Sequence, residues 1–148
     1  MALRILIADD SPLMRRVLRS LLKSNSEWEV CGEAADGQAA VKSAEQLKPD
    51  LVILDYDMPR MDGLTAAGHI SRMLPASPII LHTLHSLSDL EFDAMNNGVD
   101  KVVPKSEGAE LVPAIRELLA ARANKPSSSL TEPNRMAARL DSDLVEVG

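Results

Sequence analysis

Short apolar segments alternate five times with segments of helical periodicity along this 148-residue chain, and this alternation restricts the fold more than any other feature. Segments so short and so apolar are predicted as strands. They are residues 3–8, 28–31, 51–54, 78–81 and, more weakly, 102–103. Strands separated by helix-length crossovers pair in parallel with right-handed connections. The alternation therefore predicts a three-layer α/β sandwich in which helices cover both faces of a five-stranded sheet.

The intervening segments carry their own start and stop signals. Ser11 and Pro12 form an N-cap and first-turn pair, and the apolar residues that follow repeat with helical spacing up to Leu22. Similar patterns predict the other four helices, at residues 37–47, 64–74, 87–96 and 107–123. The polar run 124–129 ends the last helix, so we expect one domain over residues 1–123. Residues 124–148 are predicted to be a linker or C-terminal tail, in which a short amphipathic helix would fit.

Composition excludes several function classes. Hydrophobic residues make up 45% of the chain and charged residues 26%, so a core can be buried. A net charge of −6 argues against direct binding of nucleic acid or of an anionic membrane. There is a single cysteine, and neither a leader pattern nor a bilayer-length apolar run is present in the sequence. We therefore expect a soluble, cytoplasmic protein that does not act at membranes.

Polar residues follow the predicted strands where each one ends. Asp9 and Asp10 follow the first, Asp55 and Asp57 the third, Thr83 the fourth, and Lys105 the fifth. Any one of them alone is more simply explained as a helix cap, a turn former or a solvated charge. Together they would share the sheet edge where open parallel sheets bind ligands.

Crowded carboxylates need a cation, and Mg²⁺ prefers such oxygen ligands together with a phosphate oxygen. Lys105 and Thr83 could then bind phosphoryl oxygens. Asp55, at the end of the most apolar strand, is the predicted nucleophile. The product would be an aspartyl phosphate.

These residues, with the DYDMPRMDG stretch at 55–63, resemble the receiver domain of bacterial two-component response regulators over residues 3 to about 122. The resemblance implies a doubly wound, flavodoxin-like sheet of order 2-1-3-4-5. It implies that Asp55 is the phosphoacceptor and that Thr83 and Lys105 bind the phosphoryl group. It also implies Mg²⁺ held by Asp10, Asp55 and the main-chain carbonyl of Asp57, with Asp9 nearby through water.

The resemblance further implies a sensor histidine kinase or phosphotransfer protein as phosphodonor. An output domain or effector protein would read a surface made by the fourth helix, fifth strand and fifth helix, through which a homodimer could also form. Such a domain catalyses its own phosphorylation chemistry but turns over no external metabolite. Whether it stands alone or belongs to a longer regulator stays open, because residues 105–111 resemble receivers that precede helix-turn-helix domains.

Four positions near the site set this chain apart or tune its chemistry. Val102 replaces the aromatic residue that most receivers place three residues before the lysine, so the usual ring rotation cannot occur. Leu84 is bulkier than the small residue usual there and would shield the acyl phosphate, which predicts slow self-dephosphorylation. By the resemblance, His85 and Asp57 also tune the lifetime of the phosphoaspartate.

Two other functions are kept as alternatives. One is a pseudo-receiver that acts only as a protein-binding module, which the missing aromatic favours and the complete acidic, Thr and Lys set disfavours. The other is a haloacid dehalogenase-type phosphohydrolase, since Asp55 and Asp57 after an apolar strand are also similar to that family's nucleophile and general acid. In that family an acidic pair follows the lysine, whereas here Asp9 and Asp10 precede it.

Overall fold

A computed structural model describes the backbone of residues 2–84 and 87–123 and the side chains of residues 2–84 and 90–122. The predicted tail, 124–148, lies outside the described residues. Met1–Leu118 form one compact unit, and Leu119–Gly148 are grouped separately. The sheet and all five strands belong to the first of these units.

Strands and helices alternate in the predicted order. The strands are β1 (Leu3–Ala8), β2 (Trp28–Ala34), β3 (Leu51–Asp55), β4 (Ile79–Thr83) and β5 (Lys101–Pro104). The helices are α1 (Pro12–Lys23), α2 (Gly37–Leu47), α3 (Gly63–Met73), α4 (Leu87–Asn96) and α5 (Leu111–Ala123), with a 3₁₀ helix, η1 (Lys105–Glu110), before α5. All four strand pairings are parallel and the order is β2-β1-β3-β4-β5, so the predicted doubly wound sheet is confirmed.

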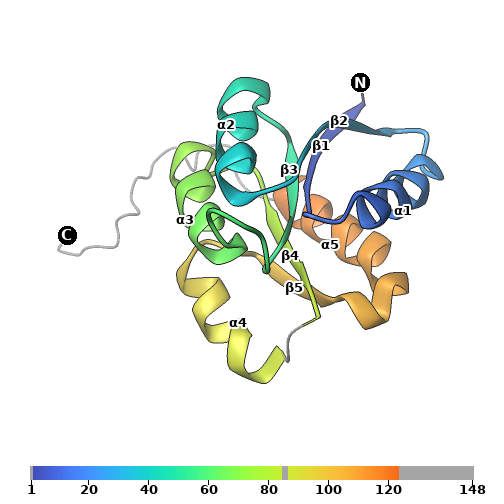
Figure 1. Cartoon of the computed structure of the whole chain (residues 1–148). Coiled ribbons are helices and arrows are strands. Elements are labelled where there is room, and N and C mark those ends of the chain that lie inside the picture. Colours follow the sequence, from blue (N-terminus) through green and yellow to red (C-terminus); the bar gives the residue numbers. More distant parts are fainter. Residues whose placement is uncertain (1, 85–86, 124–148) are drawn as a thin grey trace, which may run out of the picture. The chain divides into compact units, whose positions relative to one another are not determined.

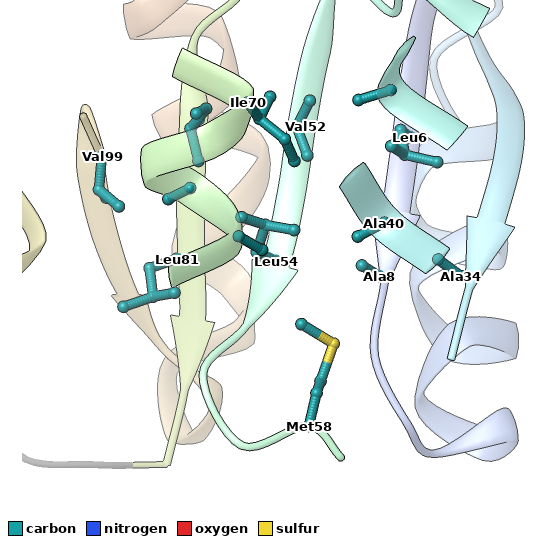
Figure 2. Packing of buried hydrophobic residues seen from close by; sticks show 14 of the residues in the cluster. Leu6, Ala8, Ala34, Ala40, Val52, Leu54, Met58, Ile70, Leu81 and Val99 are labelled. Carbon is teal, nitrogen blue, oxygen red and sulfur yellow. The ribbon is translucent and has the colours of Figure 1, made fainter. Parts of the chain in front are cut away.

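Two layers of helices cover the sheet (Figure 1). α2, α3 and α4 pack on one face, where the small residues Ala40, Ala44, Ala66 and Ala67 let the helices approach the strands closely. Figure 2 shows this layer, with Met58 at the end of the core near Ala8 and Leu54. Alternate strand residues face the other way and are buried with residues of α1 and α5. They are Ile5, Ile7, Leu51, Ile53 and Ile80.

The sequence-based boundaries differ most from the structure in two places. The helix expected over 107–123 is in fact two elements, because Glu107 has non-helical backbone angles and the 3₁₀ helix η1 ends before α5 begins. β2 runs to Ala34, three residues beyond the expected end. A register shift against β1 between Ile5 and Leu6 leaves Cys31 without a partner residue, which makes a β-bulge in β2.

Candidate functional site

The polar residues predicted to act together lie at the carboxyl-terminal ends of neighbouring strands. Asp9 and Asp10 follow β1, Asp55 is the last residue of β3, Thr83 is the last of β4, and Lys105 directly follows β5. In the observed order the winding reverses between β1 and β3, which is the position where open α/β sheets bind ligands. The sheet topology therefore places all five residues at one edge.

A partly buried lysine links two of the carboxylates. Lys105 Nζ lies 2.9 Å from Asp9 Oδ2 and 3.2 Å from Asp55 Oδ1. Asp9 is 1% exposed and Asp55 5%, so these charges have little water around them. Burial and the neighbouring Asp9 carboxylate raise the pKa of Asp55 to about 6, although Lys105 opposes the rise. Burial lowers the pKa of Lys105, but its bonds to both carboxylates outweigh that effect and raise it.

Three carboxylates stand close enough to share one cation. Asp9, Asp10 and Asp55 each offer an oxygen, and these oxygens lie within 4.8 Å of one another. Asp57 is exposed and does not belong to this group; with Asp10 it lines an open pocket of about 490 Å³ beside the acidic cluster. The remaining lining residues are Tyr56, Met58, Pro59 and Asp62.

The loop between β3 and α3 is fixed by very close backbone contacts. The Gly63 amide donates to the Tyr56 carbonyl over 2.8 Å, and a Cβ at Gly63 would lie 2.1 Å from the Asp55 carbonyl oxygen. A Cβ at Gly37, the first residue of α2, would lie 1.9 Å from the Met61 carbonyl oxygen. Both positions therefore exclude any side chain, which keeps this loop tight against the end of β3.

Hydrogen bonds fix both the backbone and the side chain of Asp9. Its amide donates to the Ala34 carbonyl over 3.0 Å, and its Oδ1 accepts from the Ser11 amide over 2.9 Å. Its carbonyl accepts from Arg15 Nη1 over 2.6 Å. The sequence pattern did not mark Arg15 as part of the site, because an arginine in an amphipathic helix is usually a solvated charge.

His82 is a second residue that the sequence pattern did not mark. It lies beside Asp55 in the register of β3 and β4, is 3% exposed, and neither ring nitrogen has a hydrogen-bond partner among the described residues. Burial, and then the charge of Lys105, lower its pKa to about 4, with Asp9 opposing. The site thus contains a neutral imidazole next to its charges.

Other residues singled out in the sequence have mixed placements. Thr83 is fully buried, Leu84 is 78% exposed, and Val102 is half-buried against the core. The side chain of His85 lies outside the described residues. Within the part of the chain that the structure describes, no helix has the length and apolarity needed to cross a bilayer.

Comparisons with known proteins agree with this geometry. A model of the response regulator receiver domain matches residues 5–116. Protein-glutamate methylesterase/protein-glutamine glutaminase 1 of Geobacter sulfurreducens is 36% identical over 131 residues, which are 86% of this chain. The chain spans only 36% of the length of that relative.

Two solved structures show the same arrangement of elements. The response regulator domain of Thermotoga maritima CheB is 27% identical, with a TM-score of 0.75, and the match covers 85% of this chain and 100% of that domain. The CheX-CheY-BeF3-Mg+2 complex from Borrelia burgdorferi is 25% identical, with a TM-score of 0.74, covering 78% of this chain and 88% of the other.

Proposed function

The chain belongs to the response regulator receiver domain family of two-component signalling, and on this premise we propose that Asp55 accepts a phosphoryl group from a sensor histidine kinase or phosphotransfer protein. One observation carries the proposal: Lys105 Nζ bridges Asp55 and Asp9 in a buried setting beside Asp10. A buried carboxylate beside a fixed ammonium group can receive a dianionic phosphoryl group once a cation offsets the charge of the adjacent acidic pair.

Mg²⁺ fits the residues present. The donors are carboxylate oxygens of Asp9, Asp10 and Asp55, which are hard ligands, and their close approach leaves negative charge that Lys105 alone does not balance. Asp57 would contribute through its main-chain carbonyl, as the resemblance implies. When bound, Mg²⁺ would offset charge on the phosphoryl oxygens.

The chemistry assigned to the chain's own residues is a single displacement. An Asp55 carboxylate oxygen attacks the phosphorus of a phosphohistidine, the new O–P bond forms as the N–P bond breaks, and the electron pair leaves with the imidazole nitrogen. Lys105 would bind a phosphoryl oxygen, exchanging part of its contact with Asp55 for the new dianion. The buried Thr83 hydroxyl would bind a second oxygen.

Phosphorylation at Asp55 would be read at a different surface of the domain. We assign residues 1–123 to the receiver and leave 124–148 as a linker or tail. Phosphorylation would bias a two-state surface formed by α4, β5 and α5, which an output domain, an effector or a second copy would read. Because Val102 has no ring to rotate, the shift would pass through the backbone after Thr83. The slow dephosphorylation expected from Leu84 also stays a prediction.

Neither alternative function gains support from a specific observation. A phosphohydrolase of the haloacid dehalogenase type would need its acidic pair after the lysine, but the acidic pair that joins Asp55 comes from the end of β1. A pseudo-receiver has no need for the buried bridge between Lys105 and two carboxylates. The relatives' methylesterase and glutaminase names describe proteins of which this chain covers about a third, and we do not extend those activities to it.

The test is the intact mass after exposure to acetyl phosphate with Mg²⁺. Wild type should gain one phosphoryl group, and a chelator should abolish the gain. Asp55→Asn should gain none, whereas Asp93→Asn, a matched change at an exposed residue of α4, should behave as wild type. Equal gain in Asp55→Asn would refute the assignment of the acceptor, and no gain in folded wild type would favour the pseudo-receiver.

A further inference from the structure

We propose that Arg15 is a positioning residue for the acidic cluster and that, held by Glu33 and Arg19, it sets the affinity of the site for Mg²⁺. The inference rests on the proposed function for the identity of the cation. We call Arg15, Glu33 and Arg19 the arginine clamp. None of the three carries a ligand oxygen of the cluster, so any effect on the metal must pass through another residue.

The clamp joins α1 to the end of β2 through two short contacts. Arg15 Nε donates to Glu33 Oε1 over 2.9 Å, and Arg19 Nε donates to Glu33 Oε2 over 2.6 Å. Each carboxylate oxygen of Glu33 therefore has its own guanidinium, and the bonds from Arg19 and then Arg15 lower the pKa of Glu33 despite partial burial. With its Nε fixed in this way, Arg15 directs Nη1 at the Asp9 carbonyl, 2.6 Å away.

The Asp9 carbonyl matters because it belongs to the peptide that joins two proposed ligands. The Asp9 side chain is fixed by Lys105 and the Ser11 amide, but Asp10 is exposed. The orientation of the Asp9–Asp10 peptide is therefore what aims the Asp10 carboxylate at the cluster. Arg15 supplies the hydrogen bond that holds this peptide from the carbonyl side. Without it, Asp10 would sample positions away from Asp9 and Asp55.

Charge alone would act in the opposite direction, and the structure indicates which effect is larger. A guanidinium near an acidic cluster repels a divalent cation, so losing its charge should strengthen binding. Glu33 accepts from both Arg15 and Arg19, so it offsets part of that charge. The positional effect is expected to be the larger, because removal of groups that orient metal ligands typically weakens metal affinity about 10- to 100-fold.

The clamp contributes little to the free energy of unfolding, so its effect on Mg²⁺ affinity can be measured separately from its effect on stability. The side chains of Arg15, Glu33 and Arg19 are 18%, 29% and 48% exposed, and ion pairs in such surroundings are weak. Loss of the clamp should therefore leave the fold intact while changing the metal site. A residue with a merely structural role would instead change the thermal midpoint and leave Mg²⁺ affinity unchanged.

The experiment is calorimetric titration of the full chain with MgCl₂, without phosphodonor. Arg15→Met keeps the length of the side chain without donors and should weaken Mg²⁺ binding about 10-fold or more. Arg15→Lys should recover part of the loss, because one ammonium can reach the carbonyl or Glu33 but not both. Arg16→Met removes the same charge from an exposed neighbour and should leave affinity unchanged or slightly stronger.

Thermal unfolding without Mg²⁺ accompanies each titration. If Arg15→Met fails to fold, Glu33→Gln serves instead and should also weaken binding, because it frees Arg15 and leaves its charge uncancelled. Wild-type affinity in folded Arg15→Met, or equal losses in Arg15→Met and Arg16→Met, would overturn the inference, as would wild type that binds no Mg²⁺. Wild type that binds Mg²⁺ but takes up no phosphoryl group would refute the proposed function and leave the inference standing.

Discussion

Lys105 is the residue on which the charge balance of the site depends. Its ammonium group contacts both Asp9 and Asp55, so two buried carboxylates share one positive charge. The remaining imbalance raises the pKa of Asp55 to about 6, after the larger effect of burial. A metal-free site of this kind stores unfavourable electrostatic free energy, which the arrival of a cation would release.

Because His82 is buried and neutral, we expect the folded protein to lose stability in acid. Its folded pKa of about 4 lies below the value of 6.5 that it would have when unfolded, so the unfolded chain binds more protons between these values. The stability that neutral His82 contributes is full above pH 6.5 and is lost as the pH falls toward 4. Between pH 6.5 and pH 4, the free energy of unfolding of wild type should fall by up to about 3 kcal/mol more than that of His82→Leu. Urea unfolding with chelator measures the difference.

The control for His82 is His69→Gln on the exposed face of α3. The loss of stability of His69→Gln in acid should match that of wild type, because His82 is unchanged in this variant. An acid loss in His82→Leu as large as in wild type would contradict the account of this residue.

A side chain at position 63 is expected to destabilise the fold for steric reasons. In Gly63→Ala the new Cβ would lie 2.1 Å from the Asp55 carbonyl oxygen, so the end of β3 or the start of α3 must shift. We expect the free energy of unfolding to fall by roughly 2 to 4 kcal/mol, measured by urea denaturation. Gly108→Ala is the matched control, since nothing lies within 4 Å of a Cβ there, and it should change stability by less than about 0.5 kcal/mol. Equal effects of the two changes would show that contact with Asp55 is not the cause.

At the scale of elements, three helices that border the site begin with the same device. Ser11, Asp36 and Asp62 each accept a backbone N–H of the first turn of α1, α2 and α3, over 3.1, 2.8 and 2.8 Å. These caps fix where each helix starts and so where each preceding loop ends. The loops before α1 and α3 carry Asp10 and the pocket residues that follow Asp55.

Ser11→Ala should lower the free energy of unfolding by about 1 kcal/mol, the usual cost of an N-cap, because the Met14 amide loses its acceptor. Chemical denaturation measures the change. Ser20→Ala, at an exposed position inside the same helix, should be neutral or slightly stabilising because alanine favours helix. A loss in Ser20→Ala equal to that in Ser11→Ala would show that helix propensity, rather than the cap, is responsible.

The elements themselves were largely predictable from local signals. Ser11-Pro12 marks the start of α1 and the fully buried strands are continuous apolar runs, as expected for a parallel sheet. η1 could not be separated from α5, because the 3₁₀ conformation depends on the chain path from Lys105 and not on periodicity. The bulge in β2 also leaves no local signal, since it depends on pairing with β1.

At the scale of the whole molecule, the site is a product of the sheet topology. The sequence identified which residues follow strands, so Asp9, Asp55, Thr83 and Lys105 could be predicted. Their proximity depends on the strand order, which came from the resemblance and not from periodicity. Arg15 could not be predicted, because its contact with Asp9 depends on how α1 packs against the end of β2.

The electrostatic strain at Asp55 has a global consequence. Its folded pKa of about 6 exceeds the unfolded value of 3.8, so the folded state binds more protons between these values and stability falls as the pH rises through them. Asp55→Asn should therefore stabilise the metal-free chain by roughly 1 to 3 kcal/mol at pH 8 and by little below pH 4. Thermal unfolding with chelator checks both the sign and the pH window.

Mg²⁺ should narrow this difference in stability. At ten times its dissociation constant a bound cation adds about 1.4 kcal/mol to wild type. Asp55→Asn, which lacks one ligand charge, should gain less. Destabilisation of metal-free Asp55→Asn at pH 8 would contradict the account of strain at this site.

Phosphorylation of Asp55 is tested by locating the phosphoryl group on the chain. Wild type is treated with acetyl phosphate and Mg²⁺, reduced with borohydride, which converts an aspartyl phosphate to homoserine, and digested for peptide mass spectrometry. We expect homoserine at position 55 and unmodified aspartate at Asp9, Asp10 and Asp57. Homoserine at one of those three positions, with Asp55 unmodified, would contradict it.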